Sequence, residues 1–170
     1  MHGFTFPENL KIVSDGITNA AGAQYNSTPV SLKYVQKAWI VVHTFCETVD
    51  ESLLITPQRA VDVAFAVPVA LGEDVPIWHC ADLGTDPEDL DREDNDVDFT
   101  VALGQTPNVT VFQIDPSALG INAANVQYTA LRVNIAEVTP GVISAGNYVC
   151  VTYYLGMRYP SADLQSVIVD

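Results

Sequence analysis

The sequence predicts an all-β protein, a β-sandwich or jelly-roll-like fold of eight to ten short strands with one or two short helical turns. Short stretches rich in β-branched and aromatic residues recur along the whole chain, and clusters of Gly, Pro, Asn and Asp separate them. Helical spacing of apolar residues is scarce. Because 170 residues suit one domain, we expect a single β-sandwich domain over 10–170, preceded by an N-terminal arm over 1–9.

The stretch from Asn108 to Gly120 gives the clearest local prediction. Side chains alternate between the two faces of a strand, and both faces of 108–114 are largely apolar. This pattern predicts a central strand that is covered on both sides. Asp115 can cap a helical turn, Pro116 suits its first position and Gly120 suits its end, so a short turn should follow.

The first half of the chain contains one long strand signal among shorter ones. Lys37–Cys46 is rich in β-branched and aromatic residues and is apolar on both faces. Arg59–Val67 is compatible with either a strand or a helical piece, because alanine is ambivalent. The other predicted elements are strands at Leu10–Ser14, Val30–Tyr34 and Ser52–Thr56, a loop over 15–29, an acidic turn over Glu47–Glu51 and a strand end at Pro57.

The second half predicts one strand with a solvent-facing side and one without. Gln127–Val138 alternates between apolar and polar residues, with Leu131, Val133 and Ile135 inward and Arg132 and Asn134 outward. Asn147–Met157 is instead apolar on both faces and contains three tyrosines. Further strands are predicted at Ile77–Ala81, Val97–Leu103 and Ser166–Val169, with a turn over Pro140–Gly146.

Charge and hydropathy exclude two classes of partner. Seven basic against 21 acidic residues give a net charge of −14, and the basic residues are scattered, so we expect no nucleic-acid partner. No apolar run approaches the 18 or so residues of a membrane span, and the start of the chain lacks the features of a signal peptide, so no membrane partner is expected. Only 16% of residues are charged, below the usual ~25%, so much of the surface must be neutral or covered by neighbours.

The sequence offers no convincing catalytic or metal site. His43 and Cys46 fall on opposite sides of a strand, as do His79 and Cys80, so neither pair can converge on zinc. Three cysteines in apolar runs are best interpreted as buried thiols. Few histidines and serines leave no Ser/His/Asp set, and no glycine-rich phosphate loop is present. We therefore expect no enzyme, no cofactor and no metal.

The acidic segment 82–98 has nine acids and one arginine. Asp94, Asp96 and Asp98 have the spacing that begins a calcium loop, but Phe99 occupies the position of the glycine and the later glutamate is missing. A solvated, mobile loop is the preferred interpretation, with a bound cation as the alternative.

Aromatic residues near the termini are the candidate partner-binding residues. Phe4 and Phe6 lie on alternate positions before Pro7, in a segment that is either a tucked edge strand or an arm that docks on a neighbouring chain. Burying each ring stabilises by roughly 1.5–3 kcal/mol, which an arm would use for attachment. The tyrosine-rich strand and the residues after it come next. The candidates are Phe4, Phe6, Tyr153, Tyr154, Arg158 and Tyr159.

Five segments of the chain resemble small virion proteins of tailed bacteriophages, the head-decoration or cement class. They are FTFPENLKIVSDG at the start, AWIVVHTF, VPIWHCAD, VFQIDPSALG, and the tail in which RYP precedes a final IVD. The resemblance implies a β-rich, often trimeric protein that is made in the host cytoplasm, binds the major capsid protein and stabilises the outer surface of the head. No catalytic residues carry over, because such families have none.

Two other functional classes compete with this expectation. One is another phage component, such as a tail-tube, neck or fibre-base protein. The other is a carbohydrate-binding β-sandwich module, which Trp39 or Trp78 exposed in a groove would favour.

Overall fold

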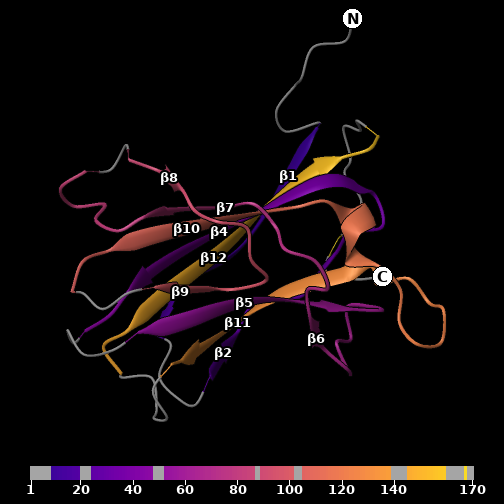
Figure 1. The fold of residues 1–170 in the computed structure, drawn as a ribbon, viewed down its shortest axis with the longest axis horizontal. Coiled ribbons are helices and arrows are strands. Elements are labelled where there is room, and N and C mark those ends of the chain that lie inside the picture. The colour runs from indigo at the N-terminus through magenta and orange to yellow at the C-terminus, as the bar shows by residue number, and fades with distance from the viewer. Residues whose placement is uncertain are drawn as a thin grey trace, which may run out of the picture.

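The structure, a computed structural model, describes residues 9–19, 24–47, 52–86, 89–101, 105–138, 145–159 and 167. These residues form two antiparallel β-sheets packed around one apolar core, which confirms the all-β sandwich predicted from the sequence (Figure 1). The described part of the chain has twelve strands rather than eight to ten, because three strands of two or three residues each, Gln24–Asn26, Val69–Ala70 and Asp91–Arg92, escape detection by sequence pattern. One four-residue 3-10 helix accompanies them.

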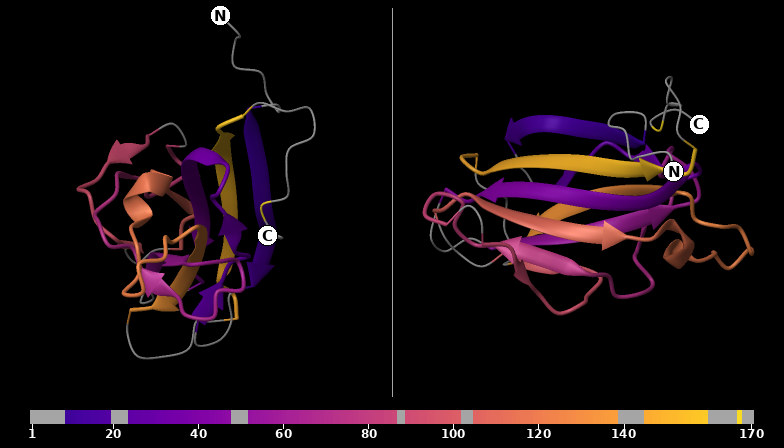
Figure 2. Two further views of the ribbon diagram at one scale, coloured as in Figure 1. Left: turned by 90° about the vertical axis from the view of Figure 1, so that its right-hand side faces the viewer. Right: turned by 90° about the horizontal axis from the view of Figure 1, so that it is seen from above.

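The first sheet has six strands in the order β1-β12-β4-β10-β7-β8. The right panel of Figure 2 shows β1, β12, β4 and β10 side by side. In spatial order the strands are β1 (Leu10–Asn19), β12 (Tyr148–Met157), β4 (Val35–Phe45), β10 (Asn108–Ile114), β7 (Ile77–Cys80) and β8 (Asp91–Arg92).

The second sheet is built on β11 (Ala130–Glu137) and β5 (Leu53–Ala60). β2 (Gln24–Asn26) and β3 (Val30–Ser31) pair with β11, while β6 (Val69–Ala70) and β9 (Phe99–Val101) pair with β5. The predicted strand end at Pro57 is wrong, because β5 runs through it. Pro57 lies at the gap between β9 and β6 on one edge of β5, a place where a residue without an N–H is tolerated.

The core lies between the sheets and follows the predicted alternation of side chains. On β11, Leu131, Val133 and Ile135 are completely buried, as expected. On β10, Phe112 and Ile114 point inward and are buried. Each such side chain stabilises the fold by roughly 1.5–3 kcal/mol relative to an exposed position. The largest fully buried side chains are Tyr153, Phe112, Ile40, Leu53, Ile55, Ile77, Ile114, Leu119, Leu131, Ile135 and Leu155.

The end of β10 is built as the sequence predicts. Asp115 caps the 3-10 helix η1 (Pro116–Leu119), and its carboxylate accepts the backbone N–H of Ser117 at 2.9 Å. Pro116 takes the first position. Gly120 follows with φ of 71°, a conformation that favours glycine.

The predicted loop over 15–29 is partly wrong, because β1 continues to Asn19 and β2 follows. A bulge between Ser14 and Ile17, with Gly16 at φ of 71°, lets the strand continue past Asp15. Tyr25 donates a hydrogen bond to Asp15 Oδ2 at 2.8 Å, which fixes the bulge to β2. Alternation of apolar residues does not reveal such polar strands.

Three further predictions meet the structure only in part. Arg59–Val67 is neither strand nor helix as a whole, since β5 ends at Ala60 and turns follow. Residues 1–8 of the arm and 140–144 of the predicted turn lie outside the described residues. Of the predicted last strand only Val167 is described, and it is a buried bend whose carbonyl accepts the N–H of Ser31.

Candidate binding surface

The two sheets differ in the chemistry of the faces that they turn away from the core. The second sheet exposes polar residues, and Asn134 there donates hydrogen bonds to Gln24 and Asn26 on the neighbouring strand. We call the corresponding face of the six-stranded sheet the outer face. Its residues are Leu10, Ile12, Ser14, Lys37, Trp39, Val41, His43, Trp78, Cys80, Arg92, Val109, Val111, Gln113, Cys150, Thr152, Tyr154 and Gly156.

The outer face is apolar and aromatic, and none of the positions just named is acidic although the chain has 21 acids. Strand register aligns its residues in rows. One row runs through Ile12, Tyr154, Trp39 and Gln113. β10 is an interior strand as predicted, but the prediction that it is covered on both sides holds only in part, because Val109 is buried whereas Val111 and Gln113 on its outer face are half-buried. Apolar strands of this kind indicate an interaction surface when a second layer is missing.

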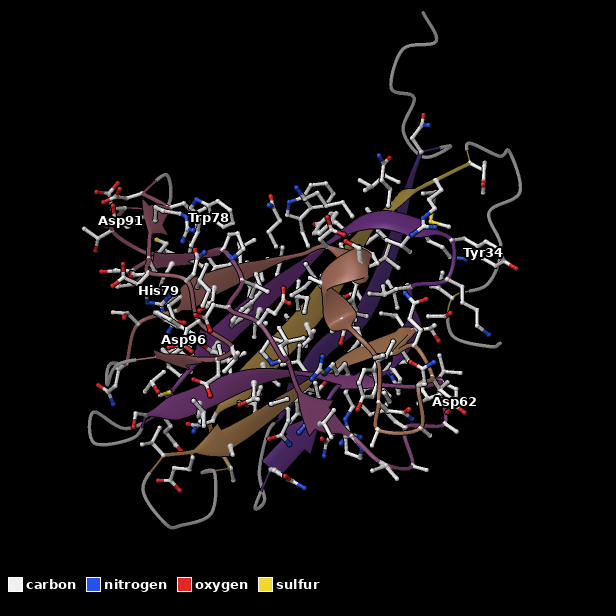
Figure 3. All side chains as sticks on the ribbon, turned by 45° about the vertical axis from the view of Figure 1, so that its right-hand side comes forward. Tyr34, Asp62, Trp78, His79, Asp91 and Asp96 are labelled. Atoms are coloured by element: carbon white, nitrogen blue, oxygen red, sulfur yellow. The ribbon has the colours of Figure 1, made fainter. Side chains whose placement is uncertain are left out.

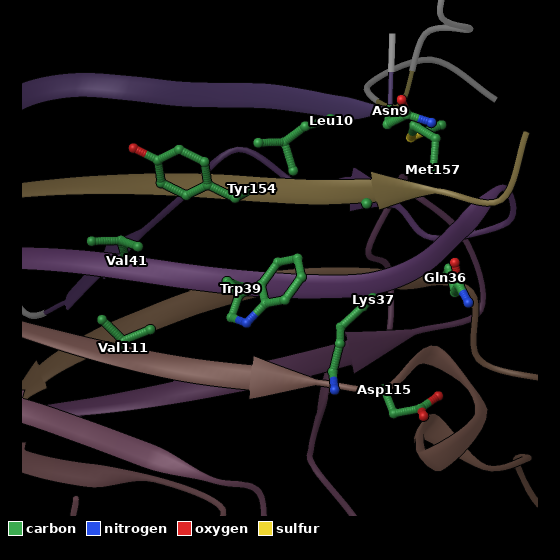
Figure 4. Close-up of a pocket in the computed structure, with 11 residues that line it drawn as sticks. Asn9, Leu10, Gln36, Lys37, Trp39, Val41, Val111, Asp115, Tyr154 and Met157 are labelled. Carbon is green, nitrogen blue, oxygen red and sulfur yellow. The ribbon is translucent and has the colours of Figure 1, made fainter. Parts of the chain in front are cut away.

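A groove of about 720 Å³ lies at one end of the outer face (Figure 4). Trp39 forms its centre, and the indole Nε1–H donates to Gln113 Oε1 at 3.3 Å, which fixes the ring. Tyr154 lies beside Trp39 on the adjacent strand. The groove is lined by Asn9, Leu10, Gln36, Lys37, Trp39, Val41, Val111, Asp115, Tyr154, Gly156 and Met157.

Lys37 and Asp115 supply charge at the same end of this groove (Figure 4). The Asp115 carboxylate accepts hydrogen bonds from the backbone N–H and the hydroxyl of Ser117, at 2.9 and 2.7 Å. These bonds lower the pKa of Asp115, with a further contribution from the positive charges of Lys37 and Arg158, so Asp115 is ionised at neutral pH. Within the described part of the chain, the half-buried Lys37 amine makes no hydrogen bond or ion pair.

A second, smaller apolar hollow of about 140 Å³ lies at the other end of the outer face. Ile17 and Tyr148 contribute to it and are 81% and 47% exposed. His43 also lines it, and partial burial lowers the pKa of this histidine, which keeps its ring neutral at pH 7. The apolar character of the outer face thus extends along its whole length.

The acidic segment 82–98 lies beside the far edge of the six-stranded sheet. Figure 3 shows Asp91 and Asp96 near Trp78 at one end of the sandwich and Tyr34 at the opposite end. Among its described acids Asp86, Asp89, Asp91, Asp94 and Asp96 are exposed as predicted, and Asp82, Glu93 and Asp98 are half-buried. The prediction of a plain loop is wrong. β8 lies within the segment, and the Arg92 guanidinium stacks on Trp78 at 4.9 Å and donates to the carbonyl of Ile77 at 2.9 Å.

The structure separates the predicted partner-binding residues. Phe4 and Phe6 lie outside the described residues. Tyr153 is completely buried and its hydroxyl bonds to Ser27 Oγ at 2.5 Å, so the prediction that it contacts a partner is wrong. Burial raises the pKa of this tyrosine. Tyr154, one residue later on the strand, points into the groove.

Arg158 and Tyr159 lie just beyond the end of β12. Both are exposed, and Arg158 Nε donates to the carbonyl of Val35 at 3.1 Å. Sequence reasoning raised Trp39 only as a possible sugar-binding residue, and it missed Lys37 and Val111 as lining residues of the groove. The signal that could have found them is that β4 and β10 are apolar on both faces. The second sheet covers only one of these faces, so the other face is left as a surface.

The described residues contain neither a metal-binding cluster nor a membrane-spanning helix. No three His, Cys, Asp or Glu side chains come together in a group that could hold a metal ion. No helix there is long and apolar enough to cross a bilayer.

Comparisons with known proteins leave the chain unassigned. No family model, no curated protein and no solved structure matches it.

Proposed function

We propose that the protein is a non-catalytic structural subunit of a phage virion, which attaches to the major capsid protein on the outside of the head through its outer face and stabilises the shell. The observation that carries this proposal is the contrast between the two faces of the sandwich. One face is polar, with hydrogen bonds between its own side chains, whereas the other is largely apolar and partly exposed, and its only carboxylate among the described lining residues is Asp115 at the end of the groove. Large apolar patches on otherwise acidic surfaces are typical of protein–protein contacts.

The size of the outer face suits such a contact. Five neighbouring strands spaced about 4.8 Å apart, up to about 33 Å long, give on the order of 600–800 Å². A stable interface buries about 800 Å² on each partner. The acidic segment at the far edge of the sheet would then remain in solvent, where its charges keep decorated particles apart.

The test is reconstitution on heads from a phage that lacks this gene. Such heads should break at a lower temperature than wild-type heads, and adding the purified protein should restore them. Thr152→Glu places a carboxylate at the centre of the outer face, and we expect it to abolish binding. Thr56→Glu is the matched control, because Thr56 is also a half-buried threonine in mid-strand but faces outward from the second sheet.

Two outcomes would contradict the proposal. Intact, stable heads without tails in the deletion phage would indicate a tail-tube, neck or fibre-base component. Equal binding by the two threonine variants would remove the outer face from the contact.

A second candidate, a carbohydrate-binding module, is favoured by the groove itself. Trp39 and Tyr154 present neighbouring aromatic rings, and Gln36, Gln113 and Asp115 offer amide and carboxylate groups nearby. Sugars bind such sites by stacking an apolar face on the ring while their hydroxyls bond to the polar rim. Titration with oligosaccharides, followed by tryptophan fluorescence, tests this function. Saturable binding that Tyr154→Ala weakens would support it, and no response across a broad glycan panel would exclude it.

A further inference from the structure

The two ends of the outer face have opposite shapes. At one end is the groove, whose lining includes Gly156, and a Cβ atom added there would lie 3.7 Å from the Trp39 ring. At the other end are Ile17 and Tyr148, which are 81% and 47% exposed. One end of the face is therefore hollow where the other end presents large apolar side chains.

These opposite shapes lie at equal distances from the middle of the face. Along β12, Tyr148 and Gly156 each lie four residues from Thr152, about 13 Å away. A two-fold axis that runs across the strands through Thr152 would therefore place Tyr148 of each copy over the groove of the other. The row of strand register along this axis contains Ser14, Thr152, Val41 and Val111.

The side chains that this axis brings together are compatible. The apolar ring of Tyr148 can pack on the Trp39 indole while its hydroxyl reaches the polar rim of the groove, where Lys37 lies. On β4, Trp39 and His43 each lie two residues from the middle row, so the indole of one copy faces the imidazole of the other. The positions that define the outer face carry no carboxylate, so the contact brings no two carboxylates together.

The area of the outer face suffices for a dimer. It measures on the order of 600–800 Å², and a stable interface buries about 800 Å² on each partner. Sheets packed face to face cross at about 30°, and the groove accommodates this angle because it spans the strands from β1 to the end of β10. A second copy is also the one partner that the protein always has before it meets a head.

We propose that the free protein is a symmetric dimer, in which the outer faces of two copies pack against each other, Thr152 lies on the two-fold axis and Tyr148 of each copy fills the groove of the other. The inference rests on the proposed function in one respect, because attachment to heads uses the same face. The dimer must then dissociate before a subunit binds the capsid, so self-association competes with head binding.

A residue on a two-fold axis meets its own copy, which gives a test specific to this symmetry. Sedimentation of the untagged protein from about 1 µM to about 1 mM should show a monomer–dimer equilibrium. Thr152→Glu and Thr152→Lys each bring like charges together, so each should associate at least about 10-fold more weakly than the wild type. An equimolar mixture of the two variants should form a heterodimer at least about 10-fold tighter than either homodimer. Thr56→Glu and Thr56→Lys, on the outward face of the second sheet, should each associate like the wild type.

The fit of Tyr148 in the groove has its own matched variants. Tyr148→Ala should weaken association about 10–100-fold, because it removes an aromatic side chain from the contact. Tyr34→Ala truncates a tyrosine of equal exposure, 46% against 47%, that lies outside the outer face, and it should leave association unchanged. Gly156→Val should weaken the dimer as Tyr148→Ala does, because the new side chain occupies the groove.

The acidic segments of the two copies lie at the same edge of this dimer, because an axis across the strands preserves the strand order. Their charges repel each other, and added salt screens that repulsion. The dimer should therefore tighten as NaCl rises, and a dimer that salt weakens would contradict the proposed symmetry.

A monomeric wild type, a dimer that Thr152→Glu leaves intact, charge variants that fail to associate when mixed, or equal association by Tyr148→Ala and Tyr34→Ala would overturn the inference. The proposed function stands after any of these results if Thr152→Glu still abolishes attachment to heads and Thr56→Glu does not. A dimer that behaves as described, together with heads whose stability does not depend on the protein, would retain the dimer and remove the proposed function.

Discussion

Tyr153 and Tyr154 are neighbours on β12 that face opposite ways, and removing the same hydroxyl from each should have different effects. Tyr153 is completely buried, and its hydroxyl bonds to Ser27 Oγ at 2.5 Å. Ser27 Oγ also accepts the N–H of Val133 at 2.8 Å. Tyr154 lies in the groove, and its hydroxyl has no bond to the described residues.

Tyr153→Phe leaves the buried Ser27 hydroxyl without one partner, which should lower the free energy of unfolding by about 1–3 kcal/mol. For a chain of this length each kcal/mol lowers Tm by about 2–4 °C, so Tm should fall by roughly 2–12 °C. Tyr154→Phe should change the free energy of unfolding by less than about 0.5 kcal/mol, because it removes a group from a half-exposed surface.

Urea unfolding followed by tryptophan fluorescence measures both variants, and an unchanged m-value shows that the states compared are the same. Ser27→Ala completes a double-mutant cycle with Tyr153→Phe, and the double variant should cost less than the sum of the single variants. Equal losses for the two tyrosine variants would refute the reasoning, since they would show that the outer face is as closely packed as the core.

Three further predictions concern titration and ions. Burial lowers the pKa of His79 below its usual 6.5, so the unfolded state binds more protons than the folded state near this pH. The free energy of unfolding should therefore fall as pH drops below about 6.5. His79→Gln should flatten this part of the pH profile of Tm. The pKa of Asp115 is lowered by Ser117, so its capping contribution should be complete above the unfolded pKa near 3.9 and lost as pH falls through the lower folded value. Asp115→Ala should cost about 1 kcal/mol at pH 7 by urea unfolding, and a cost that persists at pH 2 would contradict this account. Millimolar calcium should leave Tm nearly unchanged, because no three described carboxylates of the acidic segment come together in a group that could hold an ion. A saturable rise in Tm would reveal a bound ion.

Local chemistry in the sequence determined several elements of the fold. The strand 108–114, the Asp115 cap, the Pro116 start and the Gly120 end of the turn are all present as predicted. The alternation on β11 likewise places Leu131 and its companions in the core. These features depend on side-chain period and backbone conformation within a few residues, which a sequence contains directly.

The partners of each strand, and therefore the candidate site, were decided by the tertiary structure. Apolar residues on both faces of β4 indicate that both faces are shielded from water. They do not indicate whether the layer that covers the second face belongs to the same chain. In the described chain only one sheet faces β4, which leaves Trp39 and Val41 half-exposed. The same pattern could not separate Tyr153 from Tyr154, because the direction of a strand residue depends on which face the other sheet covers. Composition predicted an acidic protein with a partly neutral surface. Only the pairing of strands that are distant in the sequence places the uncharged side chains together on the outer face.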